Sequence, residues 1–258
     1  MGNIDSNGNI FTVQNISHSY IKPNGQFINV LYNISFVLKD QEIVSIIGPS
    51  GCGKSTFLRI MAGIEEPTSG QIHYLYGDKN SLPPVPIVMQ TSALLPWETV
   101  YGNISLCQRL LEHKEQPNKI LSYIKQMGLS EFSDFLPKDL SGGMKARVSI
   151  ARALVAAQKL IFFDEAFTEL DEITRRGLND IFNNQVRKKE LAAVVVSHDI
   201  NEAVYLANRV IVLTQRPATI AKIFHIPLEY PRTPELRHSS IFIDIVKNIR
   251  EFAMATWK

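Results

Sequence analysis

The sequence predicts an α/β fold with a mostly parallel core sheet. Three mostly apolar runs of strand length carry this prediction, because each breaks off abruptly at a glycine or at polar residues. They are residues 43–47, followed by Gly48, residues 160–163, followed by Asp164-Glu165, and residues 191–196, followed by Ser197-His198-Asp199. Uninterrupted apolar runs suit parallel strands covered on both faces. Ligands of such sheets bind at the carboxyl ends of the strands, so a site is expected there.

The first run leads through a glycine-rich loop into a helix. The loop is a full match to the phosphate-binding pattern G-x-x-x-x-G-K-[ST] and consists of Gly48, Pro49, Ser50, Gly51, Cys52, Gly53, Lys54, Ser55 and Thr56. Glycines let backbone N–H groups turn toward a phosphate, and the helix N-terminus adds positive partial charge. Lys54 can reach the β- and γ-phosphates, and the Ser55 hydroxyl can bind Mg²⁺. The strand-loop-helix context predicts a nucleoside triphosphate site rather than an ordinary glycine-rich turn.

Length and composition narrow the class of protein. The 258 residues include 45% apolar and 20% charged residues, which is ordinary for a soluble globular chain of one or two domains. A net charge of +2 gives no reason to expect nucleic acid. Two cysteines provide no disulfide framework. No apolar run approaches the roughly 18 residues of a membrane span. We therefore expect a soluble cytoplasmic protein with no membrane part of its own.

Strand patterns flank the phosphate loop on both sides. Residues 10–40 alternate in strand fashion around a turn at 23–25, which predicts an antiparallel sheet beside the loop. Tyr20 lies just before this turn, where a sheet or core aromatic is the commoner interpretation. Further on, the pattern predicts a strand at 71–76, an exposed loop at 77–86 and a brief strand at 87–90 that ends in Gln90.

Residues 91–157 change to helical spacing. Helices are predicted at 100–111, 118–127 and 144–157, which together form an inserted helical lobe. The last helix follows Ser141, Gly142 and Gly143. This start leaves free N–H groups that could bind a second anion, although Ser-Gly-Gly is also a common loop.

Three side chains at the ends of the later strands are candidates for chemistry. Beside a phosphate loop, Asp164 is the natural partner of Mg²⁺, and Glu165 is a candidate general base. Without the loop, the pair would read as a solvated acidic turn. His198 ends the next strand, where a structural histidine is the ordinary alternative.

The remaining chain predicts a helix, a hairpin and a tail. The helix spans 201–207, the hairpin strands span 209–213 and 219–226, and residues 187–189 read as a solvated helix end. The expected organisation is an ATPase domain over residues 10–226, with the helical lobe at 91–157 inserted, and a tail over 227–258. The tail carries an amphipathic helix near 241–252.

Taken together, these blocks resemble the ATPase subunit of an ABC transporter, over nearly the whole chain. The matching blocks are the phosphate loop, the signature segment at 140–144, the Walker B block at 160–165, the D-loop at 168–171, the Q-loop residue Gln90 and the switch histidine His198. Tyr20 occupies the place of the aromatic that stacks on adenine. Residues 93–97, 216–220 and 231–232 are similar to the nitrate/sulfonate/taurine importer group. Two residues depart from the family, Ala166 in place of proline and Glu169 in place of a small D-loop residue.

The resemblance implies ATP and Mg²⁺ as ligands and assigns roles. Lys54 holds the phosphates, Mg²⁺ sits on Ser55 with Gln90 and Asp164, Glu165 polarises the attacking water, and His198 contacts the γ-phosphate. Two copies would associate head-to-tail, closing ATP between the phosphate loop of one and residues 141–143 of the other. The partners implied are an integral membrane permease and, indirectly, an extracytoplasmic substrate-binding protein. The chain would then lie at the cytoplasmic face of the cell membrane.

Two rival functions fit a chain with a phosphate loop. A soluble ABC ATPase acting on nucleic acid or ribosomes would typically carry a coiled coil, zinc cysteines or a second cassette, which the sequence lacks. A P-loop kinase or GTPase is opposed by the signature segment and by the missing Asn-Lys-x-Asp motif. Leu94, Leu95, Pro96 and Trp97 form an apolar loop, predicted to dock the permease. The alternative is that they pack inside the helical lobe.

Overall fold

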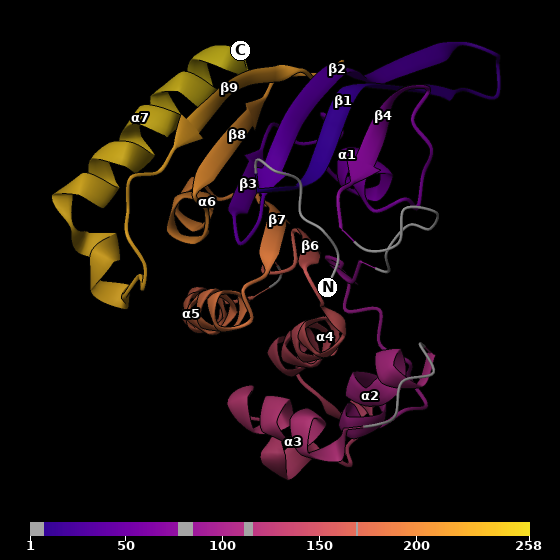
Figure 1. Ribbon diagram of the computed structural model, residues 1–258, viewed down its shortest axis with the longest axis vertical. Coiled ribbons are helices and arrows are strands. Elements are labelled where there is room, and N and C mark those ends of the chain that lie inside the picture. The colour runs from indigo at the N-terminus through magenta and orange to yellow at the C-terminus, as the bar shows by residue number, and fades with distance from the viewer. Residues whose placement is uncertain (1–7, 77–84, 111–115, 169) are drawn as a thin grey trace.

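The computed structural model describes residues 8–76, 85–110, 116–168 and 170–258 (Figure 1). Most of the loop predicted at 77–86 and the departing residue Glu169 lie outside these ranges. The chain forms a six-stranded sheet, a three-stranded sheet and a separate helical lobe. Within the described ranges no helix combines the length and apolarity needed to cross a bilayer.

The six-stranded sheet forms the core. Its order is β5 (Ile87–Val88), β6 (Leu160–Asp164), β7 (Ala192–Val196), β3 (Ile43–Ile47), β8 (Arg209–Leu213) and β9 (Ile220–His225). All neighbouring strands are parallel except β8 and β9, which form the predicted hairpin. Strands β3, β6 and β7 are buried along their whole length. This burial explains their largely apolar sequence and confirms the predicted parallel core.

The three-stranded sheet is antiparallel, as predicted, with the order β2 (Phe27–Lys39), β1 (Asn9–Ile21) and β4 (Ser69–Tyr74). Strands β1 and β2 each run for 13 residues, although the apolar alternation is broken within both. Bulges absorb these breaks: Asn15 and Asn33 have positive φ, and the register shifts beside them. Helix α1 (Lys54–Met61) packs in the core between the two sheets.

The helical lobe lies beyond the core sheet (Figure 1). It consists of α2 (Val100–Leu110), α3 (Pro117–Gln126) and α4 (Gly142–Ala156), with short 3₁₀ turns at Ser130–Phe132 and Pro137–Asp139. Helix α4 contacts both α2 and α3 and also reaches β5 of the core sheet. The lobe is therefore joined to the strand that precedes Gln90.

The C-terminal part contains α5 (Glu172–Lys188), α6 (Ile200–Leu206), a 3₁₀ turn at Pro234–His238 and α7 (Ser240–Thr256). Helix α7 runs along one side of the core sheet beside β9 and contacts α6 (Figure 1). Its buried face consists of Phe242, Val246, Ile249 and Ala253.

The prediction of a solvated helix end at 187–189 is wrong for two of its three residues. Arg187 donates to the Gln41 carbonyl at 2.8 Å and lies 3.6 Å from the centre of the Tyr230 ring. Lys189 donates to the carbonyls of Leu154 and Ala157 at the end of α4. Its burial lowers the pKa of Lys189 to about 8. Both cations supply donors to main-chain oxygens, and only Lys188 is exposed.

Candidate nucleotide-binding site

The sheet order brings four strand ends together at one edge. Ile46 on β3 pairs with Val196 on β7, Val196 pairs with Asp164 on β6, and Phe163 pairs with Val88 on β5. All four strands are parallel, so the segments after their carboxyl ends leave the sheet on the same side. These segments carry the phosphate loop, His198, Glu165 and Gln90.

The phosphate loop turns tightly between β3 and α1. Gly51 has φ 71° and Gly53 has φ 118°, in the left-handed region that favours glycine. A Cβ on Gly53 would also lie 2.6 Å from the Val30 side chain, which β2 places against the loop. Glycine is therefore required at Gly53 on two grounds. The helix that follows begins at Lys54 and presents free N–H groups to the loop.

Lys54 lies across the phosphate loop. Its ammonium nitrogen donates to the carbonyl oxygens of Gly48 at 3.1 Å and Pro49 at 3.3 Å. It also lies 3.5 Å from Oε1 of Glu165, at the end of β6. The residue is only 6% exposed, so its positive charge is concentrated inside the loop.

Ser55 and Asp164 form an oxygen pair beside Lys54. The Ser55 hydroxyl donates to Oδ1 of Asp164 at 2.9 Å. Burial raises the pKa of Asp164 above its usual value, although the hydrogen bond from Ser55 acts in the opposite direction. A buried carboxylate next to a hydroxyl is a donor set of hard oxygens, which is the type that Mg²⁺ prefers.

Glu165 lies between Lys54 and His198. Its backbone has φ 48°, a conformation costing about 1–3 kcal/mol in a non-glycine residue. The Glu165 N–H donates to the Val196 carbonyl at 3.0 Å, which holds this sharp turn against β7. Oε2 of Glu165 lies 3.9 Å from Nδ1 of His198. The strained turn thus directs the carboxylate toward the histidine and the phosphate loop together.

His198 is half-exposed, and Thr168 is its hydrogen-bond partner. The Thr168 hydroxyl lies 3.3 Å from Nδ1 of His198. Thr168 is in the turn after Glu165, whose carbonyl accepts from the Thr168 N–H at 3.1 Å. We did not predict Thr168 as part of the site. Its position three residues after Glu165, in a turn at the end of a strand, could have identified it as a site residue.

Tyr20, near the end of β1, contacts the first turn of α1. Its hydroxyl is 3.2 Å from that of Thr56, and its ring is 38% exposed. The Tyr20 ring meets the His18 ring edge-on with centroids 4.7 Å apart, and Nε2 of His18 lies 3.0 Å from Oε1 of Glu65. Neither His18 nor Glu65 was predicted from the sequence. The two-residue period of a strand places His18 and Tyr20 on one face, which could have identified the first.

The structure does not bring every predicted residue to the phosphate loop. Ser141 caps α4 by accepting from the Met144 N–H at 3.3 Å, and the Cβ side of Gly142 has nothing within 4 Å. Gly143 instead approaches Thr174 at the start of α5. Gln90 is exposed after β5. Across the described ranges, neither Gln90 nor residues 141–143 make a hydrogen bond or ion pair with residues 48–56.

A phosphate loop between a buried parallel strand and a helix, with acidic side chains at the adjacent strand end, defines a P-loop nucleotide-binding protein. Within that class, residues 31–168 match the family model described as ABC transporter. The chain belongs to the ABC transporter family.

Relatives in this family are similar to almost the whole chain. A putative ATP-binding protein of Brucella abortus is 39% identical over 239 residues, covering 87% of this chain and 91% of that protein. The aliphatic sulfonates import ATP-binding protein SsuB of Bacillus cereus is 35% identical over 240 residues, covering 92% and 93%. A related SsuB of Pseudomonas syringae is 39% identical over 203 residues, covering 79% and 82%.

Solved structures show the same fold. The dimeric structure of an ATP-binding cassette in a post-hydrolysis state, bound to ADP and Pi, superposes with a TM-score of 0.74 at 27% identity. The match covers 85% of this chain and all of the solved one. These likenesses confirm the predicted α/β fold and the resemblance to ABC ATPase subunits.

Proposed function

We propose that this chain is the ATP-binding and ATP-hydrolysing subunit of an ABC importer that powers a separate membrane permease. One observation carries the proposal: Lys54, the Ser55–Asp164 oxygen pair and Glu165 converge at a single sheet edge. They do so in a chain of the ABC transporter family that is similar to sulfonate importer subunits over about nine tenths of its length.

ATP is bound by main-chain and side-chain groups acting together. The loop amides and the start of α1 face the phosphates, and Lys54 supplies a fixed positive charge. Tyr20, half-exposed beside Thr56, offers its ring to the adenine base. The phosphates are thus held at one end of α1 while the base lies against the end of β1.

Magnesium would be held by Ser55 and Asp164, and Gln90 would supply a third oxygen ligand. The 2.9 Å contact between the Ser55 hydroxyl and the Asp164 carboxylate supports this donor set. Few protein ligands are needed, because Mg²⁺ keeps several waters and binds the substrate phosphates. When bound, the ion neutralises charge that develops on the β- and γ-phosphates.

Hydrolysis depends on positioning and charge stabilisation. Glu165 accepts a hydrogen bond from the attacking water and orients it in line with the γ-phosphate. His198, 3.9 Å from Glu165, contacts the γ-phosphate on the same side. Lys54 stabilises the negative charge of the transition state.

A complete site requires two chains. The signature segment makes no hydrogen bond or ion pair with the phosphate loop across the described ranges, and the Cβ side of Gly142 is open. A second copy arranged head-to-tail would place its residues 141–143 over the ATP held by the first. The free N–H groups at the start of α4 suit an anionic phosphate. Two solved cassettes that are similar in fold are themselves described as dimeric.

The permease docks on the apolar loop at residues 94–97, and the chain lies at the cytoplasmic face of the membrane through that contact. Trp97 is 72% exposed, whereas Leu94 packs partly against the core. Asn103 binds the Leu95 backbone through both its carbonyl oxygen and its amide group, which fixes the loop that presents Trp97. A large exposed aromatic on a fixed loop is typical of a partner surface.

The imported substrate is a small anion, and aliphatic sulfonates including taurine are the first choice, with nitrate the second. The similar importer subunits of Bacillus and Pseudomonas are named for aliphatic sulfonates, which supports the first choice. An extracytoplasmic binding protein and the permease would select the substrate.

Uptake in the source organism tests this function. The chromosomal gene is replaced by the Lys54→Ala variant, and entry of radiolabelled aliphatic sulfonate, taurine and nitrate is measured. We expect uptake of at least one anion to fall to background and to return with the wild-type gene. Unchanged uptake of all three would contradict the proposed substrate class.

A further inference from the structure

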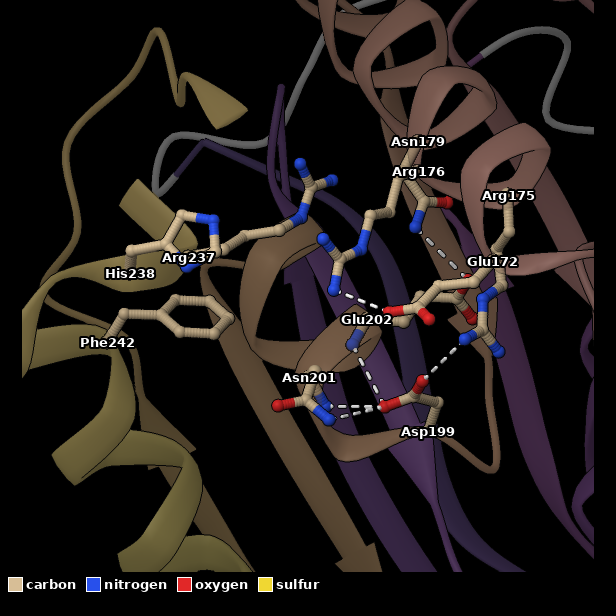
Figure 2. A pocket seen from close by; sticks show the side chains of 10 residues that line it. All are labelled: Glu172, Arg175, Arg176, Asn179, Asp199, Asn201, Glu202, Arg237, His238 and Phe242. Carbon is tan, nitrogen blue, oxygen red and sulfur yellow. Dashed lines mark hydrogen bonds and ion pairs between the residues drawn. The ribbon is translucent and has the colours of Figure 1, made fainter. Parts of the chain in front are cut away.

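The segment that carries His198 is held from both sides by polar contacts, one buried and one partly exposed. On one side, the Ser197 hydroxyl donates to Oε2 of Glu202 at 2.6 Å, and both residues are at least 93% buried. On the other side, Oδ2 of Asp199 lies 3.4 Å from Nη2 of Arg175 (Figure 2). The residues directly before and after His198 are therefore both anchored.

Glu202 connects three elements. It lies in the first turn of α6, binds Ser197 at the end of β7, and accepts from Nδ2 of Asn179 on α5 at 3.3 Å (Figure 2). Burial raises the pKa of Glu202, while the two hydrogen bonds and the Arg175 charge act in the opposite direction and Asp199 acts in the same one. The carboxyl group is thus fixed among α5, α6 and β7.

Asp199 and Arg175 form the second anchor. Asp199 caps α6 by accepting from the Asn201 N–H at 2.8 Å and the Glu202 N–H at 3.4 Å. Arg175 reaches it from the first turn of α5. The His198 segment is therefore fixed relative to both helices.

A cavity of about 200 Å³ lies beside these anchors (Figure 2). Three arginines line it, and each is already paired with a carboxylate: Arg175 with Asp199, Arg176 with Glu172, and Arg237 with Asp180. The Arg175–Asp199 pair joins α5 to the start of α6, the Arg237–Asp180 pair joins α5 to the tail, and the Arg176–Glu172 pair lies within α5. This pairing favours a mechanical role for the cluster over recognition of a ligand.

The His198 side chain has little to fix it by itself. It is 48% exposed, its hydrogen-bond partner Thr168 is 3.3 Å away, and Glu165 is 3.9 Å away. The position of the ring must therefore come from its backbone. A displacement of about 1 Å at a reacting group can cost about 10²-fold in rate.

We propose that Glu202 and Arg175 are positioning residues that hold His198 at its place beside Glu165. The inference rests on the proposed ATPase function. Neither residue reaches the phosphate loop, so both act on the rate of hydrolysis through His198 and leave nucleotide binding unchanged.

The test compares four variants of the full chain. Glu202→Leu removes the oxygen acceptors, and Glu202→Gln keeps one for Ser197. Arg175→Gln removes the ion pair with Asp199, and because Arg175 is partly exposed, the change should disturb folding little. Asn183→Ala is the matched control, because Asn183 on α5 binds the Tyr205 carbonyl of α6 at 3.2 Å, one turn beyond Asn179. For each variant, kcat, KM, affinity for an ATP analogue and the thermal midpoint are measured.

We expect Glu202→Leu and Arg175→Gln to lower kcat about tenfold or more while changing analogue affinity less than about twofold. Glu202→Gln should restore most of kcat, and Asn183→Ala should keep the wild-type kcat. If Glu202→Leu fails to fold, the kcat of Arg175→Gln alone tests the positioning role. The proposal is overturned if Arg175→Gln folds and keeps the wild-type kcat. It is also overturned if Asn183→Ala loses as much kcat as the Glu202 and Arg175 variants do.

His198→Ala separates this inference from the proposed function. If His198→Ala lowers kcat, adding Arg175→Gln to it should cause no further loss, because both act through one side chain. An additive further loss overturns the positioning role and leaves the ATPase function intact. Wild-type chain that binds ATP but never hydrolyses it would instead contradict the proposed function, and the positioning role with it.

Discussion

The Lys54 ammonium nitrogen lies 3.5 Å from the Glu165 carboxylate, which joins the phosphate loop directly to the end of β6. The same nitrogen donates to the Gly48 and Pro49 carbonyls. The cation proposed to face the γ-phosphate and the carboxylate proposed to orient water are thus in contact. Phosphoryl transfer to water needs both groups on neighbouring sides of one phosphorus atom.

Lys54→Ala should weaken ATP binding by roughly tenfold to a hundredfold or more, because it removes charge-assisted hydrogen bonds to the phosphates. Titration with a fluorescent ATP analogue measures the change. Lys188→Ala, which removes an exposed cation at the end of α5, is the control and should bind as the wild type does. Unchanged affinity of Lys54→Ala for the analogue would contradict the assignment of residues 48–56 as the phosphate-binding loop.

Tyr20→Ala should weaken ATP binding by about 1–3 kcal/mol, the range for loss of one base–aromatic stack. Tyr20→Phe should stay close to wild type, because it keeps the ring and loses only the contact with Thr56. Binding of ATP and of inorganic triphosphate is compared by calorimetry. Since triphosphate has no base, an equal loss for both ligands would show that Tyr20 supports the loop and does not stack.

Trp97→Ala should weaken association with the permease by about 2 kcal/mol or more, as expected for an exposed hot-spot aromatic. ATP hydrolysis by the isolated subunit should barely change. Leu110→Ala is a matched control, since Leu110 is also 72% exposed on the helical lobe. Co-purification with the permease and hydrolysis are measured on both variants. Normal association of Trp97→Ala would exclude the docking role.

Glu202→Gln should gain stability over the wild type as pH rises. Burial raises the pKa of Glu202 in the folded chain above its reference value of 4.5, so the folded state binds this proton more tightly than the unfolded state. The stability that the protonated carboxyl contributes is full below pH 4.5 and is lost as pH rises through the folded pKa. Glutamine has no proton to lose.

Urea unfolding of Glu202→Gln and wild type between pH 5 and pH 8 measures this difference. Glu251→Gln, which changes an exposed carboxylate on α7, is the control and should show no such gain. A stability difference that is the same at every pH would contradict the buried-carboxylate explanation.

The mostly apolar strands of the core sheet were predictable, and the sequence predicted a candidate site at their ends. The core strands are buried on both faces, so their apolar residues predicted the sheet directly, at residues 43–47, 160–163 and 191–196. The phosphate loop and the acidic pair at the end of β6 followed from chain order and motif. The family likeness supports the same assignment.

Helix α5 and the anchors around His198 were not predictable in the same way. Helix α5 is mostly polar, and only Leu178, Phe182 and Val186 mark its buried face. Its hydrogen bonds and ion pairs to α6 join residues more than 20 positions apart. Such pairs depend on how the two helices pack, and the sequence of either helix alone does not show this packing. The cations Arg187 and Lys189 were misjudged for the same reason.

Hydrolysis at increasing protein concentration is the sharpest test that the ATP site is shared between two chains. Release of phosphate from MgATP is measured for purified wild type and for Glu165→Gln over a range spanning dimer formation. We expect the wild-type rate per chain to rise with concentration, because a complete site takes residues 141–143 from a second chain. We expect Glu165→Gln to bind ATP and to hydrolyse it about 10²- to 10⁴-fold more slowly. A rate per chain that is independent of concentration, or near-normal turnover by Glu165→Gln, would contradict the account.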